Sequence, residues 1–194
     1  MKTILSVAFA ALLLTTSAKA QNVNLGIKAG LNGFNLEQDG FDYKTRINFN
    51  GGLLAHIHLG PQFGLQPEVM FSGQGAKLKT GNIDSDIKLS YINVPVLLQY
   101  MFDNGFRLQA GPQVGFLVGA KAELGNTEID IKDDYKTVDF AVTAGASYVH
   151  PPTGLGVDAR YNLGISKINE SSSVNDITNR GFQVGVFYLF NHKN

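Results

Sequence analysis

The sequence predicts an all-β protein, namely an eight-stranded antiparallel up-and-down transmembrane β-barrel preceded by a cleaved signal peptide. Three observations support this prediction. The first twenty residues resemble an export signal, and the rest of the chain alternates between apolar and polar residues. Short and long connections also follow one another in turn, which is typical of barrels that cross an outer membrane.

The composition excludes several functional classes. Of the 194 residues, 44% are hydrophobic and 16% are charged, whereas about a quarter are charged in an average soluble domain. The chain has no cysteine, which excludes disulfides, thiolate metal sites and cysteine nucleophiles. Its 16 basic and 16 acidic residues cancel, so the basic footprint that nucleic-acid binding needs is missing.

Residues 1–20 have the pattern of a secretory signal peptide. Lys2 gives a short positive start, an apolar stretch follows, and small residues occupy the positions that a signal peptidase recognises. The apolar stretch is too short for a membrane-spanning helix, which needs roughly 20 residues. We therefore expect cleavage before Gln21, with residues 21–194 forming the outer-membrane β-barrel domain.

Eight segments then repeat with a period of two, which is the signature of a strand. In the first four, one face carries residues such as Leu, Ile, Val and Phe, while the other carries mostly Gly, amides or charged residues. The fourth segment is less regular, since several positions on both of its faces are apolar. The first four predicted strands are residues 23–31, 46–59, 63–72 and 92–102.

The last four segments alternate in the same way. In the first of them, Phe106, Leu108 and Ala110 alternate with Arg107 and Gln109. Segments of roughly 10–14 residues fit a membrane, because a tilted transmembrane strand needs about 9–11. The last four predicted strands are residues 106–118, 138–148, 155–165 and 181–190.

The connections between these strands alternate strictly in length. Three are short and rich in turn-forming residues, at 60–62, 103–105 and 150–154. Four are longer and polar, at 37–45, 79–85, 122–137 and 167–178. Outer-membrane barrels have short turns at the periplasmic end and long loops outside. This pattern places both termini on the periplasmic side. The third long loop is acidic, and we expect a solvated loop there rather than a cation site.

Aromatic residues collect near the short turns and the C-terminus. Aromatic rings favour the lipid headgroup interface, so their position predicts a periplasmic girdle. Aromatics that merely pack a soluble core are the simpler alternative, but their crowding at one end favours the girdle. The predicted girdle residues are Phe63, Tyr100, Phe102, Phe106, Tyr148, Tyr188 and Phe190.

The polar face is expected to line the lumen and the apolar face to meet lipid. A soluble lipocalin-like barrel has the same period with the apolar face inside. Here the polar face is rich in glycine and neutral amides instead of the Lys and Glu of a water-facing sheet. A closed sheet also pairs every backbone polar group, as a bilayer requires.

Charged residues on that face must pair with one another, because a buried charge without a partner is costly. We expect Glu68 to pair with Arg107, and Asp158 and Arg160 to join the same network. An eight-stranded barrel is just wide enough for side chains to fill it. The predicted lumen network comprises Lys28, Arg46, His56, His58, Glu68, Arg107, Asp139, Asp158 and Arg160.

Five segments resemble an outer-membrane β-barrel domain family that includes PorT-like, porin-family proteins, and the architecture is similar to small OmpA/OmpX-type barrels. The resemblance covers the mature chain and implies location and fold more firmly than activity. These motifs concern strand register and not catalysis. They are residues 25–32, 64–72, 91–100, 108–116 and 158–164.

Two other interpretations of the polar residues are weaker. His56 and His58 lie two apart on one strand face and can present two imidazoles to a metal, but no third ligand is identifiable. His56, Glu68 and Ser72 have the residue types of a Ser–His–acid triad, a combination that often arises by chance. We therefore expect no catalytic residues, no metal and no cofactor.

The expected function is that of an integral protein of the cell outer membrane with a structural, surface-interaction or secretion-associated role and a side-chain-filled lumen. The alternative is a narrow porin that passes ions or very small solutes. A barrel-type lipid hydrolase or acyltransferase and a soluble lipocalin-like binder are less favoured. The expected partners are outer-membrane lipid and lipopolysaccharide, together with other envelope proteins, and not nucleic acid.

Overall fold

The computed structural model describes residues 23–40, 43–80, 83–125, 127–171 and 175–190. The predicted signal peptide and its cleavage point lie outside these residues. No helix in the described part of the chain is long and apolar enough to span a bilayer. The elements are β1 (Val23–Glu37), β2 (Tyr43–His58), β3 (Phe63–Thr80), β4 (Ile83–Met101), β5 (Phe106–Leu124), β6 (Thr127–Asp130), the 3-10 turn η3 (Lys132–Asp134), β7 (Val138–Val149), β8 (Leu155–Gly164) and β9 (Thr178–Leu189).

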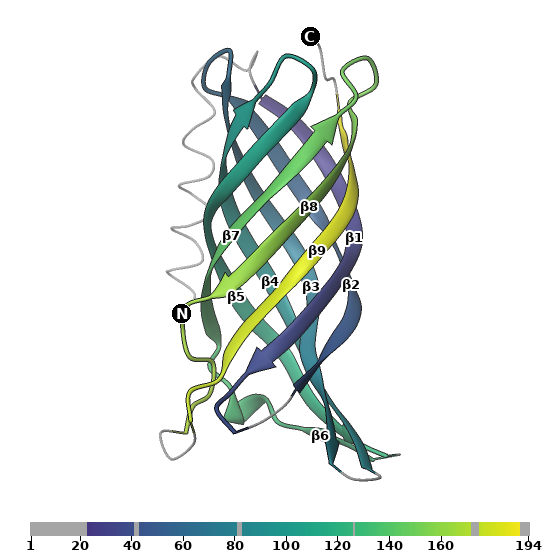
Figure 1. Cartoon of the computed structure of the whole chain (residues 1–194), viewed down its shortest axis with the longest axis vertical. Helices are drawn as coiled ribbons and strands as arrows, with labels where there is room; N and C mark the ends of the chain where they lie inside the picture. The colour runs from purple at the N-terminus through teal and green to yellow at the C-terminus, as the bar shows by residue number, and fades with distance from the viewer. Residues whose placement is uncertain (1–22, 41–42, 81–82, 126, 172–174, 191–194) are drawn as a thin grey trace.

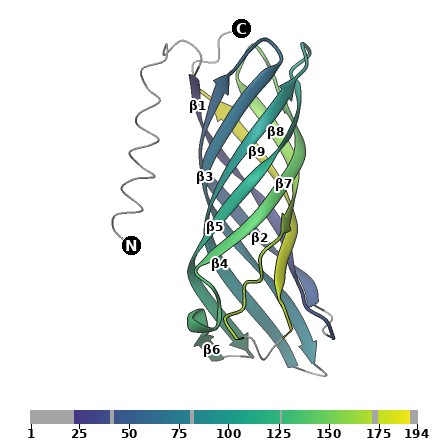
Figure 2. The ribbon, with the colours of Figure 1, turned by 90° about the vertical axis from the view of Figure 1, so that its left-hand side faces the viewer.

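Eight of these strands close into an antiparallel barrel, which confirms the predicted fold. Neighbours in sequence pair with each other around the wall, and β1 closes the cylinder by pairing with β9 as well as with β2. The short β6 stays outside the cylinder and pairs with the end of β5. Figures 1 and 2 show the strands tilted in one direction around a tall, narrow barrel.

One end of the barrel carries the short turns. The β4–β5 turn is held by a hydrogen bond from Gly105 N to Phe102 O at 3.0 Å, and Gly105 has the positive φ of 88° that glycine tolerates. The β2–β3 turn, the β7–β8 turn, the start of β1 and the end of β9 lie at the same end (Figures 1 and 2). This is the end predicted to face the periplasm.

The strands at the opposite end are longer than the sequence predicts. Strands β3, β4 and β5 contain 18, 19 and 19 residues and continue past the apolar belt, so most of the connection predicted at 79–85 is strand. The long connection at 122–137 contains β6 and η3. Charged side chains interrupt the apolar pattern there, but the backbone ladder continues, as in the register pairs Lys77↔Asp86 and Lys88↔Lys121.

The barrel is apolar outside and polar inside. Leu25 and Val69 are 60% and 49% exposed, whereas the inward-facing Glu68 and Arg160 are 2% and 4% exposed. A soluble barrel has the reverse arrangement, so the lipocalin-like alternative is wrong. The exposed belt of Leu, Val, Ile and Phe side chains instead suits contact with lipid tails.

Gly145 on β7 shows why the narrow interior needs glycine. A Cβ added there would lie 2.3 Å from the carbonyl oxygen of Ala159 and 2.7 Å from the Cβ of Arg160. Real Cβ atoms do not approach other atoms so closely. Glycine at position 145 therefore leaves room for the large Arg160 side chain, which extends into the lumen from the adjacent strand β8.

Candidate functional site

The centre of the lumen holds four charged side chains from three strands. Arg160 on β8 donates to both carboxylate oxygens of Glu68 on β3, at 2.9 Å and 2.8 Å. Its Nε donates to Asp158 at 2.9 Å, and Lys28 on β1 also contacts Asp158. Two cations and two anions thus cancel in a region closed to solvent. Such pairing, with further hydrogen bonds, is what buried charges require.

The structure gives Glu68 a different partner from the one expected. Glu68 pairs with Arg160, whereas Arg107 lies with its Nη1 3.4 Å from His56 Nδ1. The expectation of a Glu68–Arg107 pair is therefore wrong. The alternation assigns both residues to the inner face, but only the closed barrel decides which residues meet across the lumen. Asp158 and Arg160 do join the Glu68 cluster, as expected.

The other predicted lumen residues are distributed along the barrel. Arg46 lies toward the loop end, where its Nη1 donates to Gln74 O at 3.2 Å and its Nε is 3.8 Å from Asp86. Asp139 at the start of β7 accepts a hydrogen bond from Ser166 Oγ at 2.7 Å. His58 packs edge-on against His56, with ring centroids 4.5 Å apart. Each of these contacts involves residues outside the central cluster of Lys28, Glu68, Asp158 and Arg160.

The proposed triad and metal residues belong to these contacts. Ser72 accepts a hydrogen bond from Asn32 Nδ2 at 2.8 Å and another from Gln74 Nε2 at 3.1 Å, while Glu68 is occupied by Arg160. Within the described residues, no group of three or more His, Asp or Glu side chains is arranged to hold a metal ion.

Neutral amides form much of the lumen, as the amide-rich polar face predicts, although the predicted lumen network contains no individual Gln or Asn. Gln66 donates to Glu68 at 2.8 Å, and Gln99 donates to Gln66 and to Gln109 at 3.0 Å and 2.9 Å. Nearer the loop end, Asn32 donates to Ser72 at 2.8 Å. The alternation of apolar and polar residues could have identified these amides, since they occupy the polar positions of the strands.

Apolar clusters lie toward both ends of this polar interior. Leu54, Val149, Phe187 and Leu189 pack together toward the short-turn end. Toward the loop end, side chains from the barrel strands meet side chains from the long connections. None of these residues is among the predicted lumen residues. The larger cluster contains Leu36, Ala76, Leu89, Tyr91, Leu117, Ala120, Tyr135, Ile168 and Ile177.

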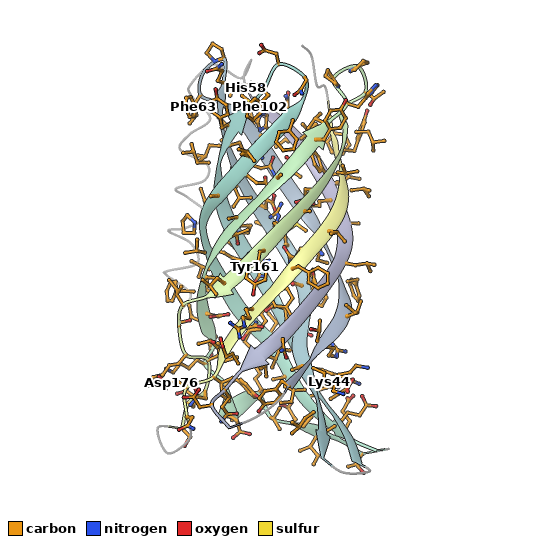
Figure 3. The ribbon with its side chains drawn as sticks, viewed as in Figure 1. Lys44, His58, Phe63, Phe102, Tyr161 and Asp176 are labelled. Atoms are coloured by element: carbon orange, nitrogen blue, oxygen red, sulfur yellow. The ribbon has the colours of Figure 1, made fainter. Side chains whose placement is uncertain are left out.

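The predicted girdle residues lie on the outer surface near the short turns. Figure 3 places Phe63 and Phe102 at that rim, close to His58. Ring centroids are 5.4 Å apart for Phe63–Tyr100, 5.0 Å for Tyr100–Phe102 and 5.7 Å for Phe102–Phe106. The rings therefore form a chain along the rim, as a girdle at the membrane interface requires. Tyr188 and Phe190 make a further pair at 5.5 Å, and Tyr148 is exposed.

The opposite end carries a charged sheet formed by the strand residues 76–80, 83–88, 120–124 and 127–130. We call it the extracellular wall because this end is predicted to face the cell exterior. Lys88 pairs with Glu123 and lies 3.4 Å from Glu128, which also contacts Lys121. The hydrogen bond from Lys121 lowers the pKa of Glu128. Lys44 and Asp176 mark this end of the molecule in Figure 3.

A cavity of about 530 Å³ lies beside the wall, between the loop that contains η3 and the loop before β9. Ile131, Tyr135 and Ile177 supply apolar side chains, and acidic residues such as Asp133 and Glu170 complete its lining. Burial raises the pKa of the Tyr135 hydroxyl to about 12. Tyr135 is thus held in its neutral form as part of the apolar cluster that covers the lumen.

A comparison with protein families identifies the family to which this barrel belongs. The model of the outer membrane protein beta-barrel domain matches residues 19–170. The chain belongs to this family. It is therefore an integral β-barrel of the outer membrane, and the predicted resemblance is confirmed. The matched residues include β1 to β8 and end before β9.

Solved structures of two other outer-membrane barrels are similar to this family member. Ail, the attachment invasion locus protein of Yersinia pestis, is 18% identical over 88% of this chain and 100% of its own, with a TM-score of 0.55. Neisserial surface protein A (NspA) is 17% identical over 86% and 95%, with a TM-score of 0.51. At these identities the likeness concerns the fold. Among curated proteins, none matches the chain.

Proposed function

We propose that this outer-membrane barrel is a surface-interaction protein whose lumen is a filled anchor and whose extracellular wall is the contact surface. The observation that carries this proposal is the contrast between the two regions. Side chains in the centre of the lumen are almost inaccessible to solvent, with Arg160 and Glu68 bound to each other. The charged side chains of the extracellular wall, by contrast, are accessible, and those of Lys88 and Lys121 are 31% and 55% exposed.

The filled lumen argues against the narrow porin. A conducting pore needs a continuous path of water, whereas the interior of an eight-stranded barrel is just wide enough to be filled by side chains or to hold one small ligand. In this protein Lys28, Glu68, Asp158 and Arg160 occupy that space, and apolar clusters lie on both sides of them. Opening the lumen would require these contacts to break together.

Lipopolysaccharide is the partner that the wall would meet first. Lys88 and Lys121 are the first charged residues above the apolar belt on the outer face of β4 and β5. Ammonium groups at that height would lie beside the phosphates of the outer leaflet. Glu123 and Glu128, which pair with these lysines, hold them on the wall. Other envelope proteins would meet the same surface.

The similar barrels are consistent with a surface role. Ail is described as an attachment invasion protein and has been solved with the heparin analogue sucrose octasulfate, and NspA is described as a surface protein. For the present chain we propose a non-enzymatic role, supported by the engagement of Ser72 with Asn32 and Gln74. Unchanged phospholipid and lipid A in cells that express the gene, with or without His56→Ala, would agree with it.

Two measurements test the proposal. The refolded protein should give no steady current in planar bilayers at neutral pH, and steady open currents would favour the porin instead. Lipopolysaccharide in the vesicle should raise the unfolding midpoint of the wild type and have less effect on a Lys88→Gln, Lys121→Gln variant. Lys167→Gln, in the loop before β9 and paired with Asp176, is the matched control. An equal response of all three proteins would exclude the wall as the lipopolysaccharide contact.

A further inference from the structure

Arg107 is a buried cation in the lumen for which the described residues supply no anion. It lies on the inner face of β5 and is 4% exposed, yet it takes part in none of the ion pairs found in the described part of the chain. Its polar contact is the long one to His56 Nδ1 at 3.4 Å. A guanidinium carries five N–H donors, and its burial without acceptors is costly.

The lumen carboxylates that the structure describes are engaged elsewhere. Glu68 binds Arg160, and Asp158 binds both Lys28 and Arg160. Asp139 lies on β7 eight residues before Ser147, the register partner of Arg107, which corresponds to roughly 26 Å along the strand. That separation is too large for a contact, so a counter-charge for Arg107 must come from outside these residues.

The amide chain presents another donor to the same region. An ionised carboxylate only accepts hydrogen bonds, so Glu68 requires the Nε2 of Gln66 to face it. Gln99 Nε2 then donates to Gln66 Oε1 and also to Gln109 Oε1. Because Gln109 uses its oxygen in this contact, its Nε2 is left over, and no partner for it is present among the described residues.

Ser147 completes the cluster. It lies directly opposite Arg107 in the β5–β7 register, where facing Cβ atoms are about 4.5–5.5 Å apart, and Gln109 follows two residues later on the same face. Ser147 is buried, and its Oγ also has no partner within the described residues. The Nε2 of Gln109 and the Oγ of Ser147 can therefore both donate at the level of the barrel where the Arg107 side chain leaves β5.

We propose that Arg107, Gln109 and Ser147 form a binding site in the lumen for a small monovalent anion of the halide class. A halide accepts hydrogen bonds from several donors at once and neutralises the guanidinium. Its size suits a lumen that is otherwise filled by side chains. The anion would act as a structural counter-ion that stabilises the folded barrel, independently of the partner bound by the extracellular wall.

The test uses bromide, whose anomalous scattering identifies it in a crystal. Crystals of the full chain grown or soaked in sodium bromide should show an anomalous peak within hydrogen-bond reach of Arg107, Gln109 and Ser147. In solution, replacing gluconate by bromide at constant ionic strength should stabilise the fold. For one site, the folding constant should rise about tenfold when bromide is at roughly ten times its Kd.

Gln109→Glu is the decisive variant because it supplies the counter-charge internally. Its carboxylate can still accept from Gln99 through one oxygen while the other faces Arg107. The variant should remain folded, lose the bromide peak and lose the bromide dependence. Lys167→Gln, which removes an exposed cation in the loop before β9, should keep both. The proposal is overturned if the wild type shows no bromide peak at Arg107, or if Gln109→Glu responds to bromide as strongly as the wild type.

Discussion

The guanidinium of Arg160 on β8 binds the carboxylate of Glu68 on β3 through two parallel hydrogen bonds of 2.9 Å and 2.8 Å. These strands are not neighbours in the sheet, so the contact crosses the lumen. It thereby ties opposite sides of the barrel together in the middle of the lumen. Two-point contacts of this kind are among the strongest and most directional in proteins.

Removing one member of this pair should be strongly destabilising. Arg160→Met leaves Glu68 buried without its cation, and we expect a loss of roughly 3–5 kcal/mol in the free energy of unfolding. Urea titrations in lipid vesicles would measure it. The double variant Glu68→Gln, Arg160→Met should lose less than the two single variants combined. Additive losses would show that the two residues act independently.

Gly145 and Gly119 offer a matched test of crowding inside the wall. An added Cβ at Gly145 meets Ala159 O at 2.3 Å, whereas at Gly119 the nearest atom is Ser90 Cβ at 3.9 Å. Gly145→Ala should therefore cost about 1–3 kcal/mol, the usual cost of overpacking. Gly119→Ala should change stability little. Denaturation curves of equal midpoint for both variants would contradict this account of the interior.

Tyr135 predicts an alkaline limit for the apolar cluster at the loop end. Burial raises its pKa to about 12, so above the pH at which an unfolded tyrosine ionises, near 10, the unfolded state loses a proton that the folded state keeps. Stability is complete below that pH and falls as the pH rises toward 12. Tyr135→Phe should remove this part of the decline and one high-pKa transition in tyrosinate absorbance. An unchanged absorbance titration would contradict the assignment.

The aromatic girdle can be located with single tryptophans, because the chain contains none. Phe102→Trp places the probe at the rim and Val184→Trp places it in the middle of β9, both on the outer surface. Lipids brominated near the headgroup should quench the indole of the Phe102→Trp variant more strongly. Lipids brominated deep in the tails should instead quench the indole of the Val184→Trp variant more strongly. The same depth for both probes would be incompatible with a girdle at the interface.

The sequence was sufficient to predict the barrel and which face of each strand meets lipid. Alternation with a period of two places Leu25 and Val69 outside and Glu68 and Arg160 inside, and the structure agrees. This information is local to each strand. It does not set the height or the angular position of a residue in the closed cylinder, so it cannot distinguish Arg160 from Arg107 as the partner of Glu68.

The period-two alternation also could not predict the contacts that the loops make. Ile168 and Ile177 lie in a polar connection that has no period, yet both are buried in the cluster at the loop end. Strand β6 begins just after a turn at Gly125, in a stretch that reads as a solvated acidic loop. The positions of such residues depend on the surface that the closed barrel offers them, which no local pattern encodes.

Because β3, β4, β5 and β6 rise beyond the apolar belt while the rest of the rim stays lower, the loop end of this barrel is lopsided (Figures 1 and 2). A molecule that approaches from outside the cell would meet the tall flank formed by these strands on one side and a lower rim on the other. The rotation of the barrel about the membrane normal therefore decides which neighbouring molecules can reach that flank.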